Sequence, residues 1–217
     1  MATYRDGVRA ALPLLIPTLA LGASFGVLAR GLGWGVVAPV VMSIVVFSGS
    51  AQFAVASVLG GGGSAAAAIL AAGLVNGRFL PMGIAAAPAL RGGRLRRAAE
   101  AQTVVDASWA IAGQDGRFDR GLLIGATAPQ FVAWVGGTAL GAASGALIGD
   151  PARYGLDALF PAFFLALLVE ELRGSDAQRT RVALAAAAIA LALVALVPPG
   201  LPIVAACAAA LVGLRRR

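Results

Sequence analysis

At 217 residues, with 59% of them hydrophobic and only 12% charged, the chain is too apolar for a soluble domain, in which about 25% of residues are charged. The formal net charge of +7 does not indicate nucleic acid as a partner, because most arginines stand just outside apolar runs, as the orientation anchors of membrane proteins do. A sequence with one cysteine and no histidine excludes a disulfide framework, the common metal sites and most enzyme chemistry, so no cofactor, metal or catalytic residue is expected.

Long uncharged runs predict an all-α, multi-pass protein of the lipid bilayer, with about seven spans and one short helix that does not cross. No charged residue occurs in 31–77, 121–149 or 182–214, and each run exceeds the ~18 residues that mark a spanning helix. We expect one membrane domain over 1–217, with spans at about 8–29, 36–59, 65–90, 122–148, 155–172, 182–197 and 201–214, and the short helix at 98–112.

The first predicted span, 8–29, has prolines near its start and small residues further on. Pro13 and Pro17 each lack a backbone N–H, and we expect them to kink or open its early turns. Gly22 and Gly26 form a small-xxx-small face that lets another helix approach closely. Two arginines precede this run as in a signal peptide, but the further spans favour a helix that is retained.

The centre of the predicted span 36–59 is polar where a lipid-facing helix would be apolar. Its sequence there is Phe47-Ser-Gly-Ser-Ala-Gln-Phe53. Polar side chains at mid-depth usually face the protein interior, and a helix can unwind at a glycine between serines and expose backbone groups to a ligand. Hydrogen bonding between helices is the alternative role. The candidate binding residues of this segment are Ser48, Gly49, Ser50 and Gln52.

The predicted span 65–90 places an arginine near its midpoint. A charged side chain at the membrane centre costs about 3 kcal/mol on insertion scales, so Arg78 needs a partner or a watery cavity. Pro81 frees a carbonyl near residue 77, and such a carbonyl can help to satisfy a guanidinium. Asn76 and Arg78 therefore join the candidate binding residues.

The densest positive segment, 91–97, predicts which face of the membrane is cytoplasmic. The residues after it, 98–112, include Glu100 and Asp106, and burying two carboxylates in so short a helix favours a re-entrant or half-depth segment. If 98–112 does not cross the membrane, an N-terminus on the outside places most of the arginines on the cytoplasmic side, so we expect the N-terminus outside. Asp106 is the candidate for coupling to protons, because burial and a nearby arginine act in opposite directions on a carboxyl group.

The later spans carry glycines and prolines but few polar groups. Gly137, Gly141 and Gly145 repeat every fourth residue within 122–148, and they predict the close approach of another helix of this chain or of a separate subunit. Pro161 interrupts the next span, and the last two are nearly pure Ala, Leu and Val. The triplets of spans before and after the short helix suggest an inverted repeat, as in many transporters.

Several of these motifs together resemble the AzlC family, the large subunit of branched-chain amino-acid exporters. They are Phe47-Ser-Gly-Ser-Ala-Gln-Phe53, Val75-Asn-Gly-Arg78, Pro81-Met-Gly83, the later Asp106, and Gly22-Ala-Ser-Phe-Gly-Val-Leu-Ala29. Two departures are Phe79, where His or Tyr often follows the Arg, and Ala107, where an acidic residue is common. The resemblance implies a multi-pass protein of the bacterial inner membrane that exports aliphatic amino acids with a small AzlD-type membrane subunit.

An aliphatic amino acid is a zwitterion and needs partners for both of its charges. Arg78 can offer a two-pronged donor to the carboxylate, while Gln52, Asn76 and an unwound 48–50 segment can bond either end. We expect these groups to line one site near mid-membrane. Two alternatives stay open: Asp106 neutralises Arg78 and the pair only holds the fold, or the chain is a non-transporting scaffold subunit of a larger complex.

Overall fold

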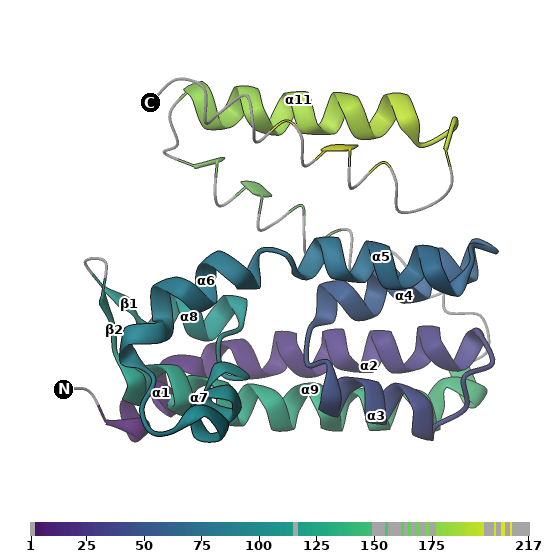
Figure 1. The fold of residues 1–217 in the computed structure, drawn as a ribbon. Coiled ribbons are helices and arrows are strands. Elements are labelled where there is room, and N and C mark those ends of the chain that lie inside the picture. The colour runs from purple at the N-terminus through teal and green to yellow at the C-terminus, as the bar shows by residue number, and fades with distance from the viewer. Residues whose placement is uncertain are drawn as a thin grey trace. The chain divides into compact units, whose positions relative to one another are not determined.

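The computed structural model describes residues 3–114, 117–148 and 177–197, with single positions elsewhere. Its elements in chain order (Figure 1) are α1 Tyr4–Ala11, η1 Leu12–Leu14, α2 Leu15–Gly31, α3 Val37–Val45, α4 Gly49–Gly60, α5 Ala65–Asn76, α6 Phe79–Ala86, η2 Ala87–Ala89, α7 Arg94–Ala101, α8 Asp106–Ala112, β1 Gly113–Gln114, β2 Arg117–Phe118, α9 Arg120–Ile148 and α11 Ala177–Leu193. The predicted helical fold is confirmed, except that β1 and β2 form a small antiparallel hairpin that the sequence did not predict.

Three helical stretches in the described part of the chain are long and apolar enough to cross a membrane. They are Tyr4–Gly31, Ala65–Ala89 and Arg120–Gly145. They correspond to the predicted spans 8–29, 65–90 and 122–148. Apart from single positions, the predicted spans 155–172 and 201–214, with Pro161, lie outside the described residues. The predicted span 182–197 overlaps α11, which begins earlier.

The chain divides into two compact units. One comprises Met1–Gly49 and Asn76–Pro151, and the other Ser50–Val75 and Ala152–Arg217. In the second unit α4 and α5 share a core formed by Ala54, Val58, Ala68 and Ala71. The glycine-rich turn between these helices ends at Ser64, whose hydroxyl accepts the Ala67 N–H at 3.2 Å and so caps the start of α5.

In the first unit, glycines let α2 and α9 lie against each other (Figure 1). A Cβ on Gly22 would come within 2.5 Å of the Trp134 carbonyl oxygen, and one on Gly141 would overlap the Ala23 carbonyl. Gly26, Gly137 and Gly145 face the partner helix in the same way. The neighbour of the glycine repeat is therefore a helix of the same chain.

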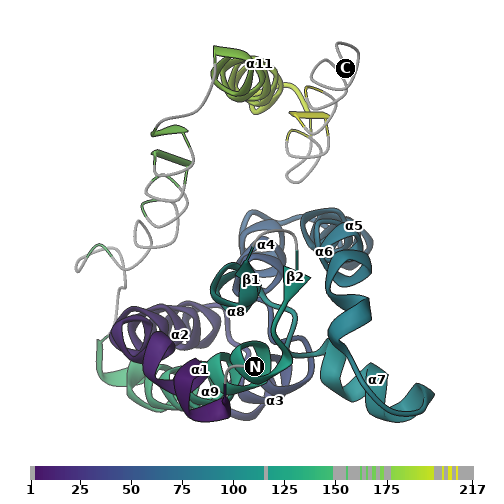
Figure 2. The same cartoon turned by 90° about the vertical axis from the view of Figure 1, so that its left-hand side faces the viewer.

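The helix formed by α1 and α2 runs in the same direction as α9. Gly7 lies against Leu122, and Gly26 against Thr138, so the residue numbers rise together along the contact. At their N-terminal ends, Arg120 donates a hydrogen bond to the Tyr4 hydroxyl. Seen from this end in Figure 2, α1 lies beside α9.

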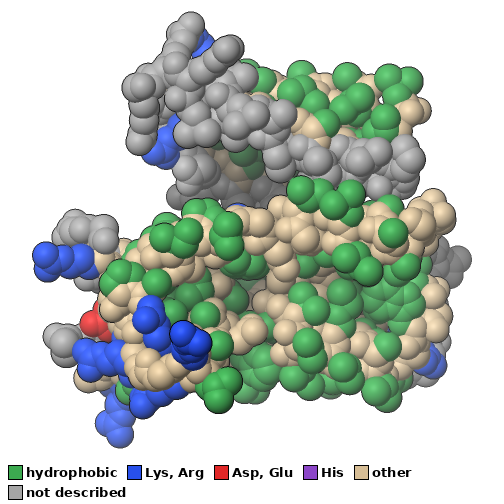
Figure 3. All heavy atoms as spheres, viewed as in Figure 1, with side chains coloured by type: hydrophobic (Ala, Val, Ile, Leu, Met, Phe, Trp, Pro, Cys, Tyr) green, Lys and Arg blue, Asp and Glu red, His purple; other side chains and the backbone are tan. Residues whose placement is uncertain are grey.

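The positive 91–97 segment lies at this same end of the first unit. Glu100, at the end of α7, pairs with Arg120 at 2.5 Å, and Figure 3 shows Arg side chains gathered there. Arg30 lies at the opposite end, against Gly145. The N-terminus and the 91–97 segment thus share a side, and the prediction that the N-terminus lies opposite this segment is wrong.

The wrong side followed from counting 36–59 as one full crossing. The structure divides it into α3 and α4, with a break at Val46–Ser48. These helices have 9 and 12 residues, and at about 1.5 Å per residue neither alone reaches across roughly 30 Å of hydrocarbon. If 36–59 does not cross, the chain crosses the membrane twice before 91–97, once in the first helix and once in the span 65–90. The start of the first helix and the 91–97 segment then lie on the same side.

The two prolines of the first helix differ in effect. Pro13 lies in η1, where the α-helix tightens to a 3-10 turn. Pro17 lies in the first turn of α2, and the helix continues through it. A missing N–H does little harm in the first turn of a helix.

Candidate functional site

Two helix breaks meet within the first unit. One is Val46–Ser48, between α3 and α4, and the other is Gly77–Arg78, between α5 and α6. The Ser48 hydroxyl donates a hydrogen bond to the Asn76 side-chain oxygen at 2.6 Å. Two of the predicted binding residues are thus brought together at the junction of the breaks.

These breaks lie level with the middle of α9. The rings of Phe47 and Phe131 meet edge to face, with their centroids 5.0 Å apart. A Cβ on Gly49 would come within 2.7 Å of the Trp134 ring. Phe131 and Trp134 are near the centre of α9, so irregular backbone stands at about half the depth of a candidate span. Such backbone is tolerated in a membrane only where protein buries it or a polar cavity adjoins it.

The sequence did not single out Phe47, although it is the residue at which the backbone turns. Among the described non-glycine residues only Phe47 has a positive φ, of 41°. A bulky side chain in that conformation costs about 1–3 kcal/mol, and such strain gathers at functional sites. The prediction placed the unwinding at Gly49. Gly49 instead begins α4, and its missing Cβ makes room for Trp134.

Arg78 and Asp106 form an ion pair with two parallel hydrogen bonds. Arg78 Nε donates to Asp106 Oδ1 at 2.9 Å, and Nη2 donates to Oδ2 at 2.8 Å. The guanidinium also lies over the Phe79 ring, 4.7 Å from its centroid. The two side chains are 32% and 55% exposed, so the described residues of the first unit leave the pair partly open. The structure therefore contains the neutralised arginine considered as an alternative above.

Further hydrogen bonds form beside both members of this pair. Pro81 has no N–H to offer the Gly77 carbonyl, which accepts the Leu80 N–H at 3.2 Å instead. Asp106 is the first residue of α8, and the Trp109 ring nitrogen of the same helix donates to the Met82 carbonyl at 3.3 Å. α8 is therefore attached at two points, to α6 through Met82 and to Arg78, the residue just before α6.

The segment predicted as one helix over 98–112 is two short helices, α7 and α8, joined by a turn. Ser108 shapes the turn by donating to the Thr103 carbonyl at 2.6 Å. The same carbonyl accepts the Thr127 hydroxyl at 2.9 Å, two turns along α9. At its far end, the Ala112 carbonyl accepts the Asp119 N–H at 3.1 Å. The segment thus starts and finishes beside the start of α9.

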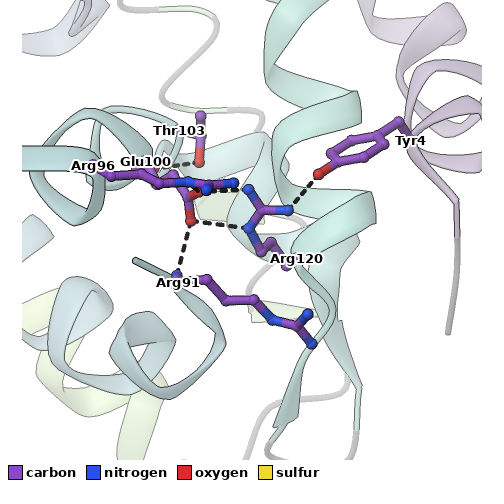
Figure 4. A network of polar contacts seen from close by, with 6 residues as sticks. All are labelled: Tyr4, Arg91, Arg96, Glu100, Thr103 and Arg120. Carbon is purple, nitrogen blue, oxygen red and sulfur yellow. Dashed lines mark hydrogen bonds and ion pairs between the residues drawn. The ribbon is translucent and has the colours of Figure 1, made fainter. Parts of the chain in front are cut away.

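A second polar network, centred on Glu100, was missed by sequence reasoning (Figure 4). Arg120 donates to Glu100 through Nη2 at 2.5 Å and through Nε at 2.9 Å, and Arg96 donates at 3.1 Å. The backbone N–H of Arg91 adds a bond at 3.0 Å. These donors, Arg120 above all, lower the pKa of Glu100 to about 2. The available signal was a lone acid following a run of arginines.

The remaining predicted binding residues are Ser50 and Gln52. Both are buried in α4 and belong to the second unit. Within the described residues, no cluster of three or more His, Cys, Asp or Glu side chains suits a metal ion.

The comparisons with known proteins agree with one another. A family model described as AzlC protein matches residues 13–148, which include both breaks and the Arg78–Asp106 pair. A Bacillus subtilis (strain 168) protein named "Branched-chain amino acid transport protein AzlC" is 26% identical over 174 residues, covering 78% of this chain and 68% of that protein.

Two further relatives have broad coverage. An "Uncharacterized membrane protein" of Archaeoglobus fulgidus is 33% identical over 200 residues, which cover 88% of this chain and 84% of the relative. The "Inner membrane protein YgaZ" of Escherichia coli (strain K12) is 27% identical over 185 residues, or 77% of this chain and 73% of the relative. No solved structure significantly matches the chain.

Proposed function

Because the chain belongs to the AzlC family, we propose that it is a multi-pass transporter of the bacterial inner membrane that exports branched-chain aliphatic amino acids. The names of the B. subtilis and E. coli relatives support the substrate class and the location. The candidate spans support a membrane carrier. The proposed partner is a small AzlD-type membrane subunit, on the strength of the family resemblance.

The Arg78–Asp106 ion pair is the observation that carries the proposal. A free amino acid is also an ion pair. Its carboxylate suits the two donors of Arg78, and its ammonium suits the Asp106 carboxylate. An amino acid inserted between them would replace one salt bridge by two. It would bring no net charge into the membrane, where an uncompensated charge is expensive.

The surroundings of the pair offer what the rest of the substrate needs. Ser48 and Asn76 hold hydrogen-bonding groups at the breaks, and interrupted helices expose backbone donors and acceptors to substrates in many transporters. The Phe79 ring beside the guanidinium supplies apolar surface for an aliphatic side chain. Gly49, Ser50 and Gln52 stay predictions from the sequence.

Asp106 is the proposed site of proton coupling. A protonated Asp106 no longer attracts an ammonium, so a proton and an amino acid compete for the same carboxylate. Binding that is mutually exclusive in this way links the two ligands reciprocally, as the exchange of an inward proton for an outward amino acid requires. Transport by Asp106→Asn that stayed dependent on the proton gradient would remove Asp106 from this role.

The test is valine release from cells fed a valine-containing dipeptide, with and without this chain and its partner. Arg78→Gln should lower export by about 100-fold, because two charge-assisted hydrogen bonds are lost. Arg78→Lys keeps the charge but not the planar donors, and its export should lie between that of the unmodified chain and that of Arg78→Gln. Arg97→Gln is the matched control. Normal export by an abundant Arg78→Gln protein would rule out substrate binding by Arg78.

One feature favours the alternative of a non-transporting scaffold subunit: the ion pair, beside the Trp109–Met82 hydrogen bond, also ties the N-cap residue of α6 to α8. The double variant Arg78→Gln with Asp106→Asn separates the two functions, because it removes both charges together. We expect the double variant to regain membrane abundance but not export. Recovery of export as well would assign the pair a purely structural role.

A further inference from the structure

A cavity of about 340 Å³ lies in the first unit, apart from the proposed transport site. Its lining includes Tyr4, Ala89 and Arg120, together with Arg91, Phe118 and Asp119. The first three are terminal residues of the three candidate spans. The cavity therefore lies at the depth where these helices leave the hydrocarbon, which is the level of the lipid headgroups.

We propose that this cavity binds the phosphate of an anionic phospholipid. Arg91 is the central donor. Its hydrogen bond to Glu100 uses the backbone N–H, and Figure 4 shows its side chain extending away from Glu100. Within the described chain, no carboxylate forms an ion pair with the Arg91 guanidinium. Arginine recognises phosphate through parallel N–H groups.

The other polar side chains of the cavity are already hydrogen-bonded within the protein, so Arg91 is the one proposed to donate to the phosphate. Arg120 is paired with Glu100 and bonded to the Tyr4 hydroxyl. Asp119 caps α9, because its Oδ1 accepts the Leu122 N–H at 3.1 Å. Arg120 and Asp119 thus form fixed walls with opposite charges, and Arg91 supplies the extra positive charge.

The surface around the cavity fits the membrane interface. Arg94, Arg96 and Arg97 of α7 are exposed, and basic clusters on the cytoplasmic side attract anionic lipids. On the same helix Leu95 is 90% exposed, which suits a helix that lies along the boundary between headgroups and acyl chains. Tyr4 and Phe118 add aromatic rings, which are common at that level.

The experiment compares lipids retained by the purified full-length chain, by native mass spectrometry after exchange into phosphatidylglycerol or phosphatidylcholine. The measurement is made at high salt, which screens the non-specific attraction between surface arginines and anionic lipids. Arg91→Gln keeps the backbone N–H to Glu100 and should retain about tenfold less phosphatidylglycerol, through the loss of charge-assisted hydrogen bonds. Arg94→Gln removes the same charge outside the cavity and should stay within about twofold of the unmodified chain.

Each outcome decides the proposal. Equal losses in the two variants would indicate a diffuse basic surface and overturn it, as would an unmodified chain with no preference for phosphatidylglycerol over phosphatidylcholine. Inorganic phosphate should compete with the lipid; bound phosphate without retained lipid would show that the ligand is the free ion and would also overturn it. Lipid retention needs no transport, so the result is independent of the function proposed above.

Discussion

The Ser48 hydroxyl donates a 2.6 Å hydrogen bond to the Asn76 side chain, and this bond joins the break after α3 to the break after α5. Ser48 is only 4% exposed. A change in backbone conformation at either break therefore shifts the other break through this bond. Asn76, which accepts the bond, is two residues before Arg78.

Ser48→Ala should destabilise the junction of the breaks. The variant leaves the half-buried Asn76 oxygen without this donor, at a cost of about 0.5–1.5 kcal/mol, the net contribution of a typical hydrogen bond. We expect a lower unfolding temperature in detergent and weaker valine export. Ser57→Ala, at an exposed position of α4, is the control and should change neither. Unchanged stability of Ser48→Ala would mean that the bond does not hold the breaks together.

Gly141→Ala should separate α2 from α9. The added Cβ would overlap the Ala23 carbonyl, and overpacking of this kind costs about 1–3 kcal/mol. Gly136→Ala is the matched control on the same helix, because nothing lies within 4 Å of its Cβ position. It should be neutral, or stabilising by up to about 1 kcal/mol through helix propensity. Thermal unfolding of the two variants checks the prediction, and equal melting temperatures would contradict it.

Glu100 should make stability depend on acid. Its pKa is lowered from 4.5 to about 2 in the folded chain, so it stabilises the fold above pH 4.5, and that contribution is lost as the pH falls toward 2. The melting temperature of Glu100→Gln should therefore lie below that of the unmodified chain at neutral pH, and the difference should shrink across this acidic range. A difference that does not vary with pH would show that the network does not act through the charge of Glu100.

The N-terminus and the 91–97 segment should face the cytoplasm together. In a Cys207→Ala background, Gly31→Cys should react with a membrane-impermeant maleimide in intact cells. Ala2→Cys and Gly93→Cys should react only after the membrane is permeabilised. The reason is the shared end of α1, α7 and α9, combined with the positive-inside rule. Opposite labelling of residues 2 and 93 would contradict this arrangement.

The sequence alone was sufficient for the class of the protein, and it singled out the residues that the structure pairs, Ser48 with Asn76 and Arg78 with Asp106. Uncharged runs longer than a bilayer is thick require helices, because no other open structure satisfies its backbone in lipid. Arg78 stood out because a charge in such a run is expensive. The resemblance to the AzlC family is confirmed by the match over 13–148. Local composition and spacing carry this information, so no contact between distant residues was needed.

Only the tertiary structure decided which residues meet. It assigned α2 of the same chain to the glycine repeat, paired Arg78 with Asp106, and placed the turn at Phe47. It also showed that the N-terminal end of α1 is on the same side as the 91–97 segment, contrary to the prediction, because 36–59 is divided into two short helices. A hydrophobic run shows that a segment is long enough to cross the membrane. Whether it does so, and which neighbour it then touches, depends on packing between parts of the chain that are far apart in sequence.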